Sequence, residues 1–252
     1  MPEPTRWGRR EFLAGAAAAA TAAACASPHP NATPPTSVAS VPPAASSATP
    51  TFVNAGPRTS PRVALTFHVS GDPDLATTML DLLHRRGVVV TAFMVGTFVD
   101  QHPEIVRRLV TDGHEVANHT YTHLTFASLP RAEMTSEVTK CRDVLSRIVG
   151  TPGRFFRPSG TTNGTDPPSA AELAVITNAG YSTVVGFDVD PADYADPGAD
   201  AVASRTIAAV QPGSIVSLHF GHQGTIDALP RIVDALDSRR LQPVTTSALL
   251  AS

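Results

Sequence analysis

The sequence predicts an α/β protein whose folded part is a distorted or incomplete (β/α) barrel of about seven βα units. From Arg62 onward, short apolar or β-branched runs alternate with longer segments in which apolar residues recur at three- and four-residue steps. Such alternation is typical of parallel strands that are joined by crossover helices. Because the units are fewer than the eight of a complete barrel, we expect an incomplete or distorted one.

The short runs have the composition of buried strands, since they are rich in β-branched and aromatic residues and end at turn-forming residues. The expected strands are Val63–Phe67, Val88–Val95, Glu115–Asn118, Phe155–Arg157, Ser182–Val185, Ser214–His219 and Gln242–Thr245.

Helices are expected between these strands, because apolar side chains spaced by three and four residues form a stripe that can face the core. The expected helices are Thr77–His84, Ile105–Val110, Glu133–Ile148, Ala170–Ala179, Ala201–Val210 and Ile226–Leu236. Pro103, Pro130 and Pro168 stand at or just before helix starts, where proline is well tolerated.

The first 25 residues have the layout of an export signal peptide. Arg9 and Arg10 precede a mildly apolar alanine run, which resembles a twin-arginine signal. The residues before Cys25 resemble a lipoprotein cleavage site, so we expect a lipid on Cys25 that anchors the protein to the membrane. The expected location is the outer face of the cytoplasmic membrane or the cell envelope. If an ordinary signal peptidase cleaves instead, Cys25 is incidental and the protein is secreted.

Residues 26–60 are mostly Pro, Ala, Ser and Thr, and we expect them to form a disordered tether before a single domain at residues 61–252. In that domain Cys141 is the only cysteine, which excludes an internal disulfide and suits a buried apolar position on a helix. The net charge of −3, with no basic block beyond the N-terminus, predicts no nucleic-acid partner. No feature indicates an oligomeric state.

Polar residues stand at the ends of five expected strands: His68, His119, Arg157, Asp188 and His219. Functional side chains of (β/α) barrels gather at the carboxyl ends of the strands. We therefore expect these five side chains to lie close together at the open end of the barrel formed by the carboxyl ends of its strands.

His119 and His123 form the strongest single pattern. Two imidazoles four residues apart fall on one side of a helical turn, where both can reach one tetrahedral ion of the zinc type. The pair alone is a weak indicator, because two surface histidines in a solvated turn would have the same spacing.

In its context, Asp112-Gly113-His114-Glu115-Val116-Ala117-Asn118-His119, the pair resembles the second motif of the polysaccharide deacetylases, carbohydrate esterase family four. Further motifs follow in the family's order over about residues 62–248. They are Phe155-Phe156-Arg157-Pro158, the run Phe187–Tyr194, which is similar to D-x-x-D-W, and the final strand Gly213–His219.

The resemblance implies a hydrolase that removes N-acetyl groups from a cell-envelope or extracellular polysaccharide with the help of a divalent metal, for which we expect zinc. It implies that His119 and His123 bind the metal, that Arg157 orients the catalytic base, and that Asp193 holds His219, which protonates the leaving amine. Tyr194 replaces the family's tryptophan and Ser217 a leucine, so the acyl pocket should be more polar.

The first motif departs from the family, which has T-F-D-D-G-P where this chain has Thr66-Phe67-His68-Val69-Ser70-Gly71-Asp72-Pro73. An ungapped alignment puts His68 at the position of the base and Val69 at that of a metal ligand. We expect His68 to act as the base and Asp72 to complete the metal site.

Three alternatives stay open. In the first, His68 is the third ligand and Asp72 the base. In the second, the site is inactive and the chain is a carbohydrate-binding lipoprotein. In the third, the enzyme is an O-acetyl esterase.

Overall fold

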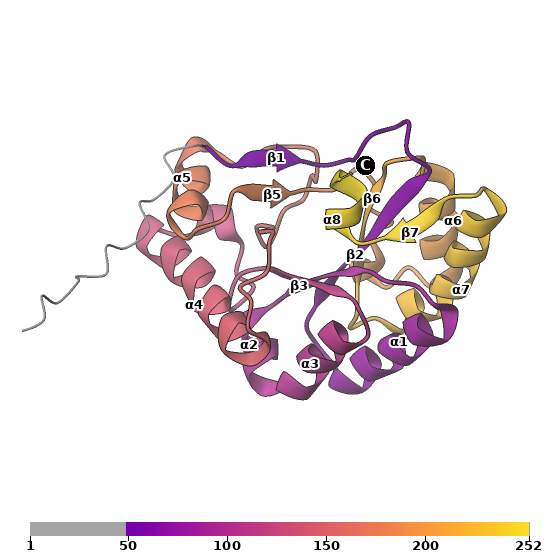
Figure 1. Cartoon of the computed structure of the whole chain (residues 1–252), viewed down its shortest axis with the longest axis horizontal. Coiled ribbons are helices and arrows are strands. Elements are labelled where there is room, and N and C mark those ends of the chain that lie inside the picture. Colours follow the sequence, from indigo (N-terminus) through magenta and orange to yellow (C-terminus); the bar gives the residue numbers. More distant parts are fainter. Residues whose placement is uncertain (1–48, 252) are drawn as a thin grey trace, which may run out of the picture. The chain divides into compact units, whose positions relative to one another are not determined.

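The computed structural model describes residues 49–251, which fall within one compact unit (Figure 1). The expected signal peptide, Cys25 and most of the expected tether lie outside these residues. The strands are β1 Thr51–Val53, β2 Arg62–Val69, β3 Thr91–Met94, β4 Glu115–Asn118, β5 Thr183–Val185, β6 Ile215–His219 and β7 Gln242–Val244. The α-helices are α1 Pro73–Arg86, α2 Gly96–Gln101, α3 Pro103–Thr111, α4 Arg131–Val149, α5 Ala170–Asn178, α6 Ala199–Ala209, α7 Gln223–Ser238 and α8 Thr246–Leu250.

Within residues 49–251 the named strands all pair in parallel, as the alternating pattern predicts. One sheet has the order β4-β3-β2-β6, with β7 beside the first residues of β2, and a second sheet pairs β1 with β5. Phe156 joins the sheets, because it bridges Asn118 of β4 and Val184 of β5, and a further bridge links Val189 to Val216 of β6. The fold is therefore the expected distorted (β/α) barrel, although Phe155–Arg157 contributes a single bridging residue where we expected a strand.

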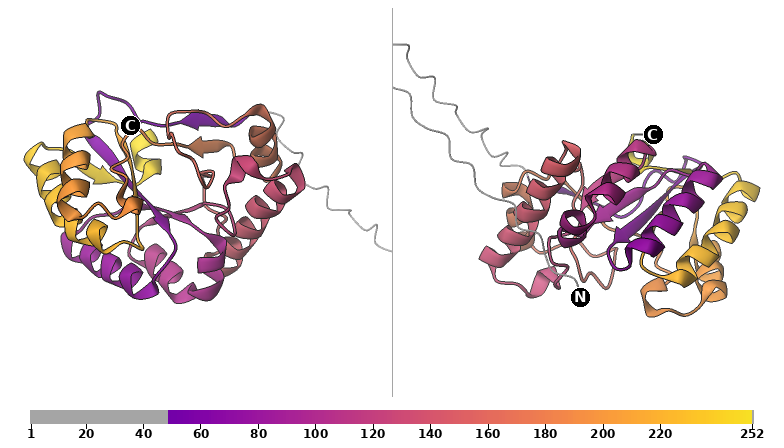
Figure 2. Two further views of the ribbon diagram at one scale, coloured as in Figure 1. Left: turned by 180° about the vertical axis from the view of Figure 1, so that it is seen from behind. Right: turned by 90° about the horizontal axis from the view of Figure 1, so that it is seen from below.

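The helices cover the outside of the strands. Figure 1 shows α4, α2, α3, α1, α7 and α6 around them, and the view from behind in Figure 2 shows the same arrangement. Alternate residues of β2 serve opposite faces. Leu65 and Phe67 pack in the large cluster with residues of the surrounding helices, whereas Ala64 packs in a separate cluster with Phe93 and Ile215. Thr66 and His68 share the face of Ala64, so the end of β2 presents polar groups to the barrel interior.

The folded domain begins earlier than the expected boundary at residue 61. Thr51–Val53 form β1 and pair with Thr183–Val185, and Phe52 packs against the cluster that contains Phe156 and Tyr181. This strand is too short to stand out in a proline-rich region, and its partner is distant in the sequence. The short helices α2 and α8 were also not predicted.

Among residues 49–251, no helix is both long enough and apolar enough to cross a membrane. Cys141 is free and buried on α4, in agreement with the expected apolar position. Burial raises the pKa of its thiol, which keeps the group protonated and unreactive.

Candidate active site

The carboxyl ends of several strands bring a cluster of histidines together. His68 ends β2 and His219 ends β6, and the two are direct partners in the register of these strands. His119 and His123 follow β4. All four histidines line a pocket of about 360 Å³ together with Ser70, Gly160, Thr161, Thr162, Phe187, Asp190, Tyr194, Ser217 and His222.

Arg157 lies behind the pocket and is 1% exposed. Its guanidinium donates to the carbonyl oxygens of Val185 and Gly186 (both 2.9 Å), to Thr66 Oγ1 (3.0 Å) and to His68 Nε2 (3.0 Å). Burial lowers the pKa of Arg157 to about 9, so the group remains a cation at neutral pH. Because a guanidinium can only donate, Nε2 of His68 must carry a lone pair.

The contact between Arg157 and His68 determines which nitrogens of His68 and His219 carry protons. His68 Nδ1 lies 2.9 Å from His219 Nε2, and His219 Nδ1 lies 2.7 Å from Asp193 Oδ1. One arrangement satisfies every pair: Arg157 donates to His68, His68 Nδ1 donates to His219, and His219 Nδ1 donates to Asp193. Burial, followed by the neighbouring His119 and His219, holds the pKa of His68 well below its usual value, which agrees with this neutral form.

Asp193 is fixed in place independently of the imidazole. Its side chain is fully buried, and its Oδ2 accepts hydrogen bonds from the His219 backbone N–H (2.8 Å) and from Thr225 Oγ1 (2.6 Å). The structure thus brings together the Asp193–His219 pair and the Arg157 contact that the family resemblance implies, with His68 in the place of the expected carboxylate.

The nitrogens of His119 and His123 have the arrangement of a metal-binding pair. His119 Nδ1 donates to the Arg157 carbonyl oxygen at 2.9 Å, which leaves its Nε2 lone pair free, 3.2 Å from His123 Nε2. Two nitrogens bound to one tetrahedral zinc lie about 3.3 Å apart. Burial lowers the pKa values of both imidazoles, and a neutral imidazole is the form that binds metal.

His68 lies close enough to this pair to be a third donor. One ligand atom from each of His68, His119 and His123 falls within 4.8 Å of the others, and no further group of this kind is found among residues 49–251. Both nitrogens of His68 are already hydrogen-bonded, so it can bind a metal or a proton only by giving up one contact. Arg157 Nη1 keeps Thr66 as a partner when it releases His68.

The segment that carries the histidine pair is not the helical turn that we predicted. Thr120 (φ 68°) and His123 (φ 65°) are in the left-handed region, which is rare for a β-branched residue. Asn118 Oδ1 accepts from the Thr120 backbone N–H at 2.9 Å, and Thr120 Oγ1 donates to Ser159 Oγ at 3.0 Å. One hydrogen bond within the turn and one to the distant Ser159 thus hold a conformation that the spacing alone does not favour.

Glu137 of α4 is a supporting residue that the sequence analysis missed. Its buried carboxylate accepts from the backbone N–H groups of Tyr121 (2.9 Å) and Thr122 (2.7 Å) and from Thr122 Oγ1 (2.8 Å). A signal was present, because Glu137 interrupts the apolar stripe of its helix between Met134 and Val138. An acid at a core-facing position implies buried donors.

Two predicted site residues lie elsewhere. Asp72 is the N-cap of α1, where Oδ1 accepts from the Asp74 backbone N–H at 2.8 Å, and it is absent from the group of metal donors. The structure therefore keeps Asp72 apart from the histidine cluster and gives no support to either predicted role, metal ligand or base. Asp188 does not reach the mouth either, because its carboxylate accepts from the Ile215 N–H, Ser214 Oγ and Arg58.

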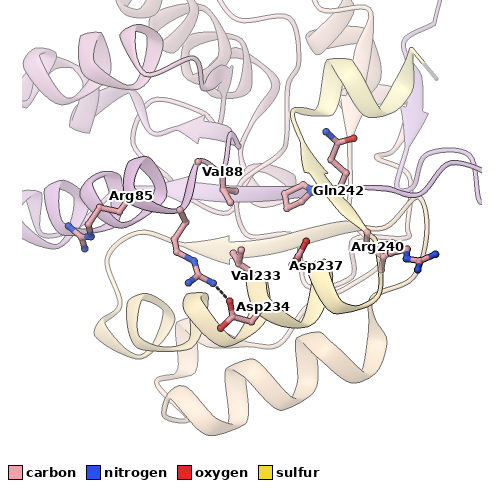
Figure 3. Close-up of a pocket in the computed structure, with 11 residues that line it drawn as sticks. Arg85, Val88, Val233, Asp234, Asp237, Arg240 and Gln242 are labelled. Carbon is pink, nitrogen blue, oxygen red and sulfur yellow. Dashed lines mark hydrogen bonds and ion pairs between the residues drawn. The ribbon is translucent and has the colours of Figure 1, made fainter.

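A larger pocket of about 670 Å³ lies at the other edge of the barrel, between the C-terminal ends of α1 and α7 and the start of β7 (Figure 3). It is lined by Arg85, Asp237, Arg240 and Gln242 among others, and an Arg86–Asp234 ion pair crosses it. No histidine lines it, and in (β/α) barrels this edge serves stability. The chemistry is therefore assigned to the histidine pocket.

This distorted (β/α) barrel with a histidine cluster at the carboxyl ends of its strands is similar to known deacetylases. The polysaccharide deacetylase family model matches residues 55–184. The chain is 39% identical to a chitooligosaccharide deacetylase of Bradyrhizobium sp. (strain ANU 289), over 64% of this chain and 71% of the relative. It is 30% identical to a peptidoglycan-N-acetylglucosamine deacetylase of Bacillus cereus, over 79% and 71%.

Solved structures of this family have the same fold as this chain. The Bc1960 peptidoglycan N-acetylglucosamine deacetylase has a TM-score of 0.73 at 27% identity, over 80% of this chain and 93% of that one. A pseudoenzyme of carbohydrate esterase family four from Bacillus anthracis has a TM-score of 0.72 at 22% identity, over 81% and 70%, which shows the fold alone. The chain belongs to the polysaccharide deacetylases, carbohydrate esterase family four. It is a hydrolase of carbon–nitrogen bonds other than peptide bonds.

The buried neutral histidines predict a pH-dependent stability. His68 and His119 have pKa values well below 6.5 in the folded chain, chiefly because of burial, so the unfolded chain binds more protons at mildly acidic pH. We expect the free energy of unfolding of EDTA-treated protein to fall as the pH drops below about 6.5. Thermal unfolding between pH 7.5 and pH 5 measures this change. The His68→Gln variant should lose less stability over that range, and an unchanged slope would contradict the assignment.

Proposed function

We propose that this enzyme removes N-acetyl groups from a cell-envelope or extracellular polysaccharide, with a divalent metal, zinc, at the histidine cluster. The observation that carries the proposal is the pair of facing Nε2 atoms of His119 and His123, 3.2 Å apart and beside the Asp193–His219 pair. Its relatives act on chitooligosaccharides and on N-acetylglucosamine of peptidoglycan, which supports an N-acetylated glycan as substrate.

The donor set fits a metal of the zinc type. His119 and His123 would hold the ion, since both offer neutral imidazole nitrogens, which suit zinc better than magnesium or calcium. A bound zinc lowers the pKa of a water molecule and polarises an acyl oxygen. The hydrogen bond from His119 Nδ1 to the Arg157 carbonyl keeps Nε2 as the ligand atom.

His68 serves as the general base in this proposal. Its Nε2 lone pair accepts a hydrogen bond from Arg157 and can take a proton once that contact opens, when Arg157 retains Thr66 as a partner. A proton accepted there makes His68 a cation, and its Nδ1 proton can pass to His219 Nε2 at 2.9 Å.

His219 serves as the general acid. Asp193 holds its Nδ1 proton, so a proton that arrives on Nε2 is the one available to the departing amine. In this scheme His68 takes a proton from the attacking water, His68 passes its Nδ1 proton to His219, and His219 gives a proton to the amine product. The His68–His219 contact gives this transfer a path within the protein.

Separate substitutions of His68 and Asp72 test the proposal. His68→Ala should keep bound zinc and lower the deacetylation rate by about 10²–10⁴-fold, as expected for loss of a general base. Asp72→Ala should keep both zinc and turnover, because Asp72 caps α1 outside the cluster. Zinc content by elemental analysis and release of acetate from penta-N-acetylchitopentaose give the two readouts. Loss of zinc in His68→Ala would make His68 a ligand, and a parent protein without acetate release would overturn the function.

We further propose that the protein is exported by the twin-arginine route and anchored by a lipid on Cys25. The support is Arg9 and Arg10 before the alanine run that ends at Cys25. Cys25→Ser should move the protein from the membrane fraction to the soluble exported fraction. Replacement of both arginines by lysine should leave precursor in the cytoplasm. Fractionation with immunoblotting measures both, and unchanged membrane association of Cys25→Ser would refute the anchor.

A further inference from the structure

Two histidine–aspartate pairs connect the same two segments of the chain. His219 and His222 are three residues apart, as are Asp193 and Asp196, and each histidine Nδ1 lies 2.7 Å from an Oδ1 of its aspartate. The sequence analysis and the family resemblance assign only the inner pair, Asp193–His219. The outer pair has no assigned role, although His222 lines the same pocket.

The outer pair lies nearer to solvent than the inner one. The side chain of Asp196 is 72% exposed and that of Asp193 is fully buried. His222 precedes α7 as its N-cap residue, and its ring lies 5.8 Å from that of His219 at an interplanar angle of 81°. The ring of Tyr194, which is 55% exposed, also lies 5.6 Å from that of His219. These positions put His222 and Tyr194 on the wall of the pocket beside the expected general acid.

The contact with Asp196 fixes which nitrogen of His222 is free. The carboxylate accepts from Nδ1–H, so Nε2 is the nitrogen of the neutral ring that can accept a hydrogen bond. Asp196 is in the left-handed region at φ 49°, which aspartate adopts more readily than most residues other than glycine. His222 is not among the donors that share one metal position with His119 and His123.

We propose that His222 is a substrate-positioning residue whose Nε2 accepts a hydrogen bond from a hydroxyl group of the sugar ring that carries the acetamido group. Sugar hydroxyls are the donors that a polysaccharide offers beside the scissile bond, and a neutral imidazole acceptor on a partly apolar wall suits them. The exposed ring of Tyr194 supplies the adjoining apolar surface. This inference rests on the proposed function for the class of substrate.

Steady-state kinetics of the zinc-loaded full chain on penta-N-acetylchitopentaose test the inference. His222→Ala should raise KM by about three- to tenfold, the value of one neutral hydrogen bond, and leave kcat within about twofold. Asp196→Ala should raise KM in the same direction by less, and His222→Gln, which keeps an acceptor, should recover part of the loss. His102→Ala is the matched control, because His102 also pairs with an acid, Glu104, but does not line the pocket.

The outcomes against the proposal are distinct. A fall in kcat at constant KM would place His222 in the chemical step, loss of zinc would make it a ligand, and unchanged kinetics would exclude contact with the sugar. Calorimetric titration of EDTA-treated protein with the same glycan separates this test from that of the proposed function. If the parent protein binds the glycan without hydrolysing it, the function fails while weaker binding by His222→Ala still supports the contact. If parent and variant bind equally, or neither binds, the inference is overturned.

Discussion

The buried guanidinium of Arg157 is the interaction on which the rest of the site depends. Its hydrogen bonds reach the carbonyls of Val185 and Gly186 at the end of β5, Thr66 of β2 and the imidazole of His68. Its own carbonyl oxygen accepts from His119. Arg157 therefore holds both the candidate base, His68, and the candidate metal ligand, His119, in place relative to β2 and β5. The ring of Phe93, 3.9 Å from Cζ, covers the guanidinium face, so the cation is held without access to water.

The replacement of a carboxylate by His68 keeps this network and changes its charge. A carboxylate beside Arg157 would form a buried ion pair, whereas His68 accepts the same hydrogen bond as a neutral group. The neutral ring can also donate from Nδ1 to His219, which a carboxylate cannot do. The base and the acid are thus linked directly in this chain, and the remaining negative charge of the network lies on Asp193, where Thr225 and the His219 N–H stabilise it.

Much of this arrangement could be predicted from the sequence because it depends on local signals. The apolar runs locate β2, β3, β4, β5, β6 and β7, and the positions of His68, His119, Arg157 and His219 at strand ends predict their convergence. The predictions that failed have both local and distant causes. Asp72 precedes a proline and a free helix N-terminus, and it takes the local cap in preference to the distant histidines. Asp188 is held by Arg58, 130 residues away, and the turn at Thr120 is held by Asn118 and Ser159. No periodicity in the sequence encodes such partners.

We propose that His119 and His123 are the main protein ligands of one catalytic zinc. The most direct test is the zinc content of purified full-length protein, compared with a His119→Ala/His123→Ala double variant and with His114→Ala as a histidine control outside the cluster. We expect about one zinc per chain in the parent and in His114→Ala, and almost none in the double variant, which should also release no acetate. A double variant that keeps a full equivalent of zinc would contradict the account.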